Sequence, residues 1–333
     1  MFEQALLAMA SVATDPYLLF LIFATTILGV IIGVLPGLGA TTGAALLLPF
    51  TLTMDPVHAI AVLATIYVSA TFAGSITAIL INTPGTSAAA ATTFDGYPLA
   101  QKGEAGRALG VAVISSTVGG VFSVIVLCFA APLLARVAYE FRSPEYFALT
   151  VFGLSMLASI SAGGAVKNLI GGIFGVWLST IGAERVTGIE RFMFGNYELY
   201  EGLHFVPIFI GLFAISELLV QSKTVNKIVD TVSMKAVKLP TKEDYKKIWK
   251  TILRSCGIGT FIGVLPAEGA TVASMIGYSE ARRWSKNKEE FGKGSIEGIA
   301  GAEAANNSAT GGAMVPTMVL GIPGSGTTAI ILV

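Results

Sequence analysis

The stretch GVIIGVLPGLGATTG, residues 29 to 43, decides the fold because it places a proline and several glycines inside an apolar run. Proline removes a backbone hydrogen-bond donor and clashes with the preceding helical turn, and glycine adopts backbone conformations closed to other residues. The sequence therefore predicts a helix that is broken at Pro36, Gly37 and Gly39.

The same stretch recurs later in the chain. Residues 259 to 271 read GTFIGVLPAEGAT, and nine of thirteen positions are identical to residues 29 to 41 at a constant offset of 230. Two broken helices in one hydrophobic chain are typical of secondary transporters that are built from repeats and bind their substrate where the backbone is unwound.

The composition indicates an integral membrane protein. Charged residues are 13% of the chain, hydrophobic residues are 53%, and the mean hydropathy is +0.74. Soluble domains contain about 25% charged residues. The apolar runs are too continuous for the alternating pattern of a membrane barrel, so we expect an all-α polytopic membrane protein. Cys128 and Cys256 are too few and too isolated for a disulfide framework or a metal cluster.

Apolar runs separated by turn residues predict membrane segments at 17–35, 40–53, 57–82, 108–133, 146–162, 165–183 and 204–221. The first two segments are either two full spans or a re-entrant hairpin, and both arrangements need the break covered by protein or facing a wet cavity. No cleavable signal peptide is visible. The apolar run after Gly324 is too short to span, so we expect a C-terminal part to be missing.

The distribution of lysine and arginine predicts the domain organisation. Residues 222–254 contain nine Lys or Arg and three acids, which indicates the cytoplasmic side. We therefore divide the chain into a first transmembrane repeat, 1–221, a basic cytoplasmic connector, 222–251, and the start of a second repeat, 252–333. Five expected spans separate the two breaks, and an odd number gives the repeats inverted topology.

A second Pro-Gly element follows each break, NTPGTSAAAATT at 82–93 and GIPGSGTTA at 321–329. A Pro-Gly break followed by hydroxyl residues at a helix N-terminus presents backbone N–H groups to an anion. The resulting candidates for substrate binding are Pro36, Gly37, Gly39, Thr41, Thr42, Pro84, Gly85, Thr86, Ser87, Gly269, Thr271, Pro323, Gly324, Ser325 and Thr327.

The alternative is that glycines four residues apart, Gly29, Gly33 and Gly37, only let helices approach closely. Repetition of the proline and of the following Gly-Ala-Thr favours a site.

A polar run, EGIAGAEAANNSATGGA at 297–313, carries candidates for coupling to Na⁺ or H⁺: Glu303, Asn306 and Asn307, with Ser308 and Thr310 beside them. Polar groups at membrane depth are functional hypotheses, and carboxylate and amide oxygens suit a hard cation. The alternative is a cytoplasmic loop, since Lys293 precedes the run. Glu268, beside Pro266, is a further candidate for ion coupling.

Other chemistry is not indicated. The run GIPGSGTT has Thr327 where a phosphate loop requires lysine, and His58 and His204 are too isolated for a metal site. We find no nucleophile with a base at usable spacing, so an intramembrane enzyme is not favoured. No cofactor beyond a coupling ion and no nucleic acid partner is expected. A channel or a structural membrane scaffold remains the alternative to a carrier.

Three stretches resemble the large membrane subunit of the tripartite tricarboxylate transporters, the TctA family. They are residues 29–43, 73–110 (AGSITAILINTPGTSAAAATTFDGYPLAQKGEAGRALG) and 289–328 (EEFGKGSIEGIAGAEAANNSATGGAMVPTMVLGIPGSGTT). The resemblance implies a bacterial inner-membrane secondary transporter that works with a smaller membrane subunit and a periplasmic solute-binding protein delivering a carboxylate. It also implies coupling to an ion gradient rather than ATP. The second break departs from the first motif by reading PAEGA instead of PGLGA.

The topology is testable by labelling. Single cysteines at Gly195 and Lys238, in a background lacking the two native cysteines, should react oppositely with an impermeant maleimide in intact cells. Position 195 should react because its loop is poor in Lys and Arg, and position 238 should react only after lysis. Equal labelling at both positions would contradict inverted topology.

Overall fold

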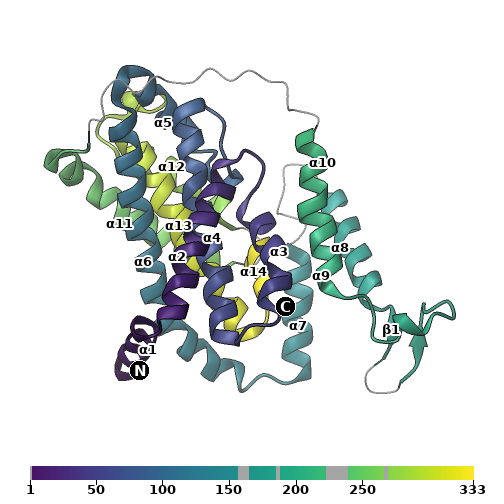
Figure 1. Cartoon of the computed structure of the whole chain (residues 1–333). Coiled ribbons are helices and arrows are strands. Elements are labelled where there is room, and N and C mark those ends of the chain that lie inside the picture. Colours follow the sequence, from purple (N-terminus) through teal and green to yellow (C-terminus); the bar gives the residue numbers. More distant parts are fainter. Residues whose placement is uncertain (1, 157–164, 185–187, 223–238, 266–268) are drawn as a thin grey trace.

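The computed structural model describes residues 2–156, 165–184, 188–222, 239–265 and 269–333, and these residues are almost entirely helical (Figure 1). The first part contains α1 (Phe2–Thr14), α2 (Pro16–Val34), α3 (Ala40–Thr51), α4 (Pro56–Ile81), η1 (Ser87–Ala89), α5 (Thr93–Leu99), η2 (Ala100–Glu104) and α6 (Ala105–Ala138).

The middle part contains α7 (Ser143–Met156), α8 (Ala165–Ser179), β1 (Gly182–Ala183), β2 (Glu190–Arg191), η4 (Tyr197–Leu199), α9 (Phe205–Phe209), η5 (Ile210–Ile215) and α10 (Ser216–Ser222). The last part contains α11 (Lys242–Val264), α12 (Gly269–Trp284), η6 (Lys288–Glu290), α13 (Ile296–Leu320) and α14 (Gly326–Ile331). The all-α fold is thus as expected, apart from the short antiparallel pair of β1 and β2.

Local sequence explains where the long helices begin. The Asp15 carboxylate accepts hydrogen bonds from the backbone N–H groups of Tyr17 and Leu18, both at 3.0 Å, and Pro16 is the first residue of α2. Asp55 and Pro56 start α4 in the same way. An aspartate cap followed by proline fits a helix start because proline has no N–H to leave unpaired there.

Both predicted breaks are present. Helix α2 ends at Val34, α3 begins at Ala40, and Gly37 between them has φ +91°, which favours glycine. Helix α11 ends at Val264 and α12 begins at Gly269. The intervening Pro266 to Glu268, including the ion-coupling candidate Glu268, lie outside the described residues.

Not every expected span is one membrane-length helix. Among the described residues, the stretches long and apolar enough to cross a membrane are Pro16–Val34, Pro56–Ile81 and Thr93–Ala138. Helix α3 has 12 residues, which is too short to span, so 40–53 is not a full span. The segment expected at 204–221 is one uninterrupted helical run, residues 205–222, formed by α9, η5 and α10, with η5 as a π-helical middle. The expected span 146–162 runs partly beyond the described residues.

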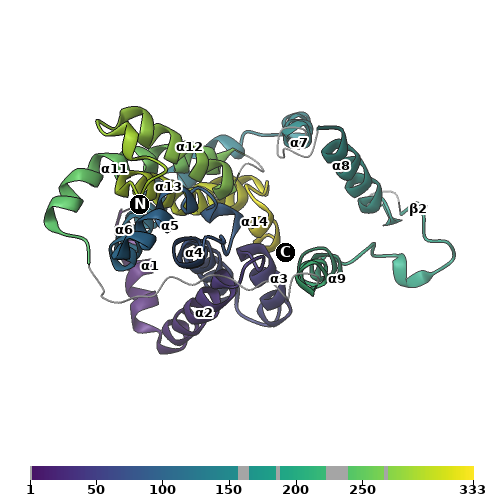
Figure 2. The same ribbon diagram turned by 90° about the horizontal axis from the view of Figure 1, so that it is seen from above.

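Helix α13 lies at the centre of the bundle, with α6, α11 and α12 packed around it (Figures 1 and 2). Every residue from Gly298 to Thr317 is buried. The cytoplasmic-loop interpretation of residues 297–313 is therefore wrong. The segment is a helix because its alanines favour helical structure and its small side chains let neighbouring helices come close.

Glycines bring the helices of each broken pair close to a partner helix. A Cβ atom built on Gly33 of α2 would lie 2.8 Å from Ala70 Cα of α4. A Cβ atom on Gly263 of α11 would lie 2.9 Å from Ala309 Cα of α13. Gly33 and Gly263 differ by the repeat offset of 230, so the same close contact occurs twice. The packing role considered for the spaced glycines holds at Gly33.

Helices α7 to α10 and the β1–β2 pair extend to one side of this bundle (Figure 2). They approach it through η5 and α9, which contact α3. The bundle of α2–α6 and α11–α14 therefore carries the polar groups of interest.

The close contacts predict a contrast within α11. Gly259→Ala would place a Cβ atom 2.7 Å from Ala305 Cα, whereas a Cβ atom on Gly257 meets nothing within 4 Å. Overpacking costs about 1 to 3 kcal/mol, while alanine improves helix propensity over glycine by up to about 1 kcal/mol. Thermal unfolding in detergent should show a lower midpoint for Gly259→Ala and an unchanged or higher midpoint for Gly257→Ala. Equal midpoints would contradict this packing.

Candidate functional site

The Pro-Gly segments meet in pairs across the molecule. The hydroxyl of Thr41, which follows the first break, lies 2.9 Å from the hydroxyl of Thr327 in the last Pro-Gly element. The hydroxyl of Thr271, which follows the second break, lies 2.9 Å from that of Ser87 in the first Pro-Gly element. Each break therefore contacts the Pro-Gly element that belongs to the other part of the chain.

Further contacts join each break to the element of its own part. The Gly37 N–H donates to the Gly85 carbonyl at 3.2 Å, and the Gly85 N–H donates to the Gly74 carbonyl of α4 at 3.1 Å. A Cβ atom on Gly269 would lie 3.8 Å from Ser325 Cβ. The structure thus brings together all the predicted segments that it describes.

Burial separates the candidates. Pro36, Gly37 and Ser87 are exposed, and Gly39, Thr41, Pro84, Gly269, Thr271, Pro323 and Ser325 are half-buried. Thr42, Gly85, Thr86, Gly324 and Thr327 are buried. Gly324 packs against α13, because a Cβ atom there would lie 2.7 Å from Ala313 Cα. Gly39 is different, since a Cβ atom there would meet nothing within 4 Å.

The helix starts differ in whether a side chain accepts hydrogen bonds from their first backbone N–H groups. Gly39, the N-cap residue before α3, provides no side-chain cap, and Thr86 makes no cap bond to η1. Ser325 and Thr328 instead form a capping box at the start of α14. The first N–H groups of α3 are therefore available to an anion, whereas the Ser325 hydroxyl is already used.

Two buried hydroxyls near these segments lack a hydrogen-bond partner among the described residues, Thr86 Oγ1 and the Tyr67 phenol. Tyr67 lies on α4, packs against Ala40 at the start of α3, and faces Ser325. Unpaired buried polar groups are costly, so the open hydroxyl of Tyr67 beside the start of α3 fits a ligand-binding function. Tyr67 was not among the candidates, because in the sequence it is only a polar tip on an apolar helix.

A second polar cluster surrounds Glu303 in the middle of α13. The Glu303 side chain is fully buried. Its Oε1 accepts a short hydrogen bond from the Thr92 hydroxyl and one from Asn306 Nδ2 at 3.3 Å, and its Oε2 accepts from the Ser116 hydroxyl at 2.8 Å. Asn307 Nδ2 donates to Asn306 Oδ1 at 2.6 Å. The predicted trio of Glu303, Asn306 and Asn307 is thus one network.

Ser308 and Thr310 do not take part, because each hydroxyl bonds to a carbonyl of its own helix. Thr92 and Ser116, which approach from outside α13, were not among the candidates. Thr92 lies in the 82–93 element, just before α5, and Ser116 was only a hydroxyl within an apolar helical run.

A crevice of about 500 Å³ runs beside this cluster. Its walls come from α2, α4 and α6, and it reaches Ser116 and the buried Asn307. Since Ser116 donates to Glu303, the crevice ends one hydrogen bond away from the carboxylate.

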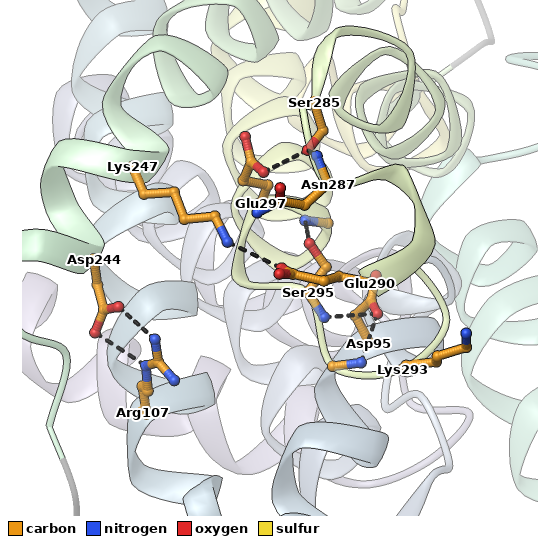
Figure 3. Close-up of polar contacts among 12 residues, drawn as sticks. Asp95, Arg107, Asp244, Lys247, Ser285, Asn287, Glu290, Lys293, Ser295 and Glu297 are labelled. Atoms are coloured by element: carbon orange, nitrogen blue, oxygen red, sulfur yellow. Dashed lines mark hydrogen bonds and ion pairs between the residues drawn. The ribbon is translucent and has the colours of Figure 1, made fainter.

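Charged residues collect at one end of the bundle (Figure 3). Arg107 Nε donates to Asp244 Oδ2 at 3.0 Å and its Nη2 donates to Oδ1, which joins α6 to α11. Asp95 accepts from the N–H groups of Gly294 and Ser295, both at 2.8 Å, which joins α5 to the start of α13. Mainly the Arg107 guanidinium, assisted by Thr241, lowers the pKa of Asp244. These contacts hold the N-terminal ends of the central helices together.

Nearly the whole chain is similar to known proteins. The family model for the "Tripartite tricarboxylate transporter TctA family" matches residues 19–333. The chain belongs to this TctA family. Together with the apolar helices, membership indicates a multi-pass membrane protein.

Two relatives from Agrobacterium vitis are similar. An "Uncharacterized 52.8 kDa protein in TAR-I ttuC' 3'region" is 43% identical over 305 residues, which are 90% of this chain and 60% of that protein. An "Uncharacterized protein in TAR-II ttuC' 3'region" is 49% identical over 65 residues, 20% of this chain and 27% of that protein. This TctA family chain therefore spans less than two thirds of the length of each relative. No solved structure matches it.

The Arg107–Asp244 pair predicts a pH-dependent stability difference. The lowered pKa of Asp244 means that its contribution is present above the ordinary value of 3.8 and is lost as the pH falls through the lowered pKa. Asp244→Asn should lower the thermal midpoint at pH 7, by a loss of about 1 to 3 kcal/mol, and differ less from the parent in strong acid.

The control is Glu243→Gln, which removes a neighbouring exposed carboxylate and should leave the midpoint unchanged at both pH values. A midpoint for Asp244→Asn that equals the parent at pH 7 would contradict the role of this pair.

Proposed function

We propose that this chain is the large membrane subunit of an ion-gradient-driven secondary transporter that imports a tricarboxylate or a related organic acid. The acid is delivered by a periplasmic solute-binding protein, and a small membrane subunit completes the complex in the bacterial inner membrane. The chain binds and moves the acid without a chemical step. Membership in the TctA family supports this proposal.

The observation that carries the proposal is the reciprocal pairing of the Pro-Gly segments, Thr41 with Thr327 and Ser87 with Thr271. Substrate sites of repeat-built transporters lie where unwound segments of the two repeats meet. We propose that residues 1–221 and 252–333 belong to two repeats of inverted topology, linked by the 222–251 connector. The glycine contacts repeated at an offset of 230 support this division.

The bound acid would be held mainly by dipoles. Neither break nor either Pro-Gly element contains Lys or Arg. We infer that the carboxylates bind to the open N–H groups at the start of α3 and to hydroxyls of Thr41, Ser87 and Thr271. Helix N-termini favour anions, and hydrogen bonds to a charged group contribute about 1.5 to 3 kcal/mol each.

Gly39 offers a direct test of this site. Its backbone, with φ −76° and ψ 176°, suits any residue, and a Cβ atom meets nothing within 4 Å. Gly39→Val should therefore fold normally yet fill the space in front of the α3 N-terminus and abolish receptor-dependent uptake of labelled citrate in proteoliposomes. Gly120→Val, at an open position on α6, is the matched control and should transport normally.

Gly324→Val does not serve this purpose, because its Cβ atom would strike α13 and disturb assembly. Normal uptake by a well-inserted Gly39→Val variant would remove the α3 N-terminus from the site. Uptake that neither saturates nor needs the receptor would instead favour a channel.

A further inference from the structure

The carboxyl group of Glu303 is fully buried, and the groups that hydrogen-bond to it are the neutral side chains of Thr92, Ser116 and Asn306. We propose that Glu303 binds and releases the coupling proton and that Asn306 transmits this change to the substrate site. This inference rests on the proposed transport function and names its coupling ion and the residues that sense it.

A negative charge on the buried Glu303 carboxyl group has a free-energy cost. A carboxylate at membrane depth is costly unless a cation or several donors compensate it. No described lysine, arginine or histidine forms an ion pair with Glu303. Taking up a proton removes the charge and its cost, so the neutral surroundings allow Glu303 to exist in both states.

The elements packed against α13 carry few groups that could take up the proton in place of Glu303. They are α4, α5, α6, α11, α12, α14 and η1. The titratable or charged side chains on these elements that lie near α13 are Asp95 on α5, Arg107 on α6, Asp244, Tyr245 and Cys256 on α11, and Tyr278 on α12, with Glu297 on α13 itself. Tyr67 on α4 packs against Ala40 and Ile331 instead.

Three of these acids have partners outside the Glu303 cluster. Asp95 accepts hydrogen bonds from the backbone at the start of α13, and Asp244 pairs with Arg107. Glu297 accepts from the Ser285 hydroxyl in the first turn of α13. Glu303 is thus the acid that lies within the neutral middle of the helix.

The groups around Glu303 favour a proton over a metal cation. The Ser116 hydroxyl lies 2.8 Å from Glu303 Oε2 and donates to it, and the Thr92 hydroxyl donates to Oε1. Hard cations hold each oxygen at about 2.3 to 2.6 Å and so keep the oxygens around them farther apart than a hydrogen bond does. Asn306 turns its nitrogen, which cannot bind a cation, toward Glu303. The arrangement suits hydrogen-bonded protons.

Asn306 links Glu303 to the proposed substrate site. Asn306 Nδ2 lies 3.3 Å from both Glu303 Oε1 and the carbonyl of Ala88 in η1. The preceding residue, Ser87, contacts Thr271 after the second break. An ionised Glu303 attracts the amide more strongly than a protonated one. Protonation therefore releases Asn306 toward Ala88 and alters the position of the Ser87 segment.

A crevice gives protons a route to Glu303. The crevice beside the cluster reaches Ser116 and Asn307 and also exposes the hydroxyl residues Thr26, Thr65 and Ser69 along its walls. Water in it could pass a proton to the Ser116 hydroxyl, which donates to Glu303 Oε2. No covalent bond other than O–H bonds forms or breaks in this exchange.

Labelling with dicyclohexylcarbodiimide tests the site, because this apolar reagent modifies protonated carboxyl groups. In the assembled transporter, Glu303 should be modified at pH 6, with modification falling at least tenfold as the pH rises and with no protection by 100 mM NaCl at fixed pH. Glu303→Gln, which keeps the shape of the neutral acid, should lose this modification. Glu297→Gln should retain it and serves as the matched control.

Labelling of Glu303 that is absent or independent of pH would overturn the inference. Protection by sodium at fixed pH would also overturn it and assign the carboxylate to Na⁺. The predicted labelling in a wild-type transporter that carries no carboxylate would support proton binding at Glu303 and overturn the proposed function, so the two failures are distinguishable.

Transport tests the coupling. In proteoliposomes, Glu303→Gln should retain exchange of labelled acid across the membrane but lose acceleration by an inward proton gradient. Asn306→Ala should weaken that acceleration at least fivefold, whereas Ser308→Ala, whose hydroxyl bonds only within α13, should not. Acceleration of Glu303→Gln equal to the wild type would overturn the role of Glu303, and normal acceleration of Asn306→Ala would overturn the link to Ala88.

Discussion

The structure depends on one constraint: a polar helix, α13, is buried from Gly298 to Thr317, so its polar side chains must find partners inside the protein. The cost of an unpaired polar group without water explains the surrounding arrangement. Thr92 and Ser116 approach Glu303 from α5 and α6, and Ala88 provides a carbonyl for Asn306. Satisfying α13 thereby fixes the position of η1, which carries Ser87 next to the second break.

The fold was predictable where a residue has one dominant conformational effect. Pro36 with Gly37, and the aspartate–proline pairs before α2 and α4, mark a break and two helix starts at the observed places. Sequence alone left the 297–313 stretch open, because its glutamates and asparagines resemble a polar loop. The decisive fact is that α6, α11 and α12 enclose it, and this enclosure is a tertiary property absent from local pattern.

The candidate site shows the same division. The sequence identified Thr41, Thr327, Ser87 and Thr271 from hydroxyls after Pro-Gly, but the identity of each pair follows only from how the two halves meet. Tyr67 and Ser116 were missed because a single hydroxyl on an apolar helix is usually bonded to its own backbone, as Thr71 is. Thr92 lies in the 82–93 element, but only the fold shows that it meets Glu303. Gly324 proved to be a packing residue, since only the structure shows α13 behind it.

The glycine contacts between α2 and α4 and between α11 and α13 have a mechanical consequence. Where Gly33 meets Ala70 and Gly263 meets Ala309, backbone lies against backbone, with no side chain between the two helices at these points. Small sliding of packed helices is limited mainly by side chains that must change rotamer. Smooth surfaces of this kind let each broken helix shift along its partner by fractions of a turn while the contact area stays nearly constant. A shift of this type would move both breaks relative to α4 and α13 without exposing the core to lipid.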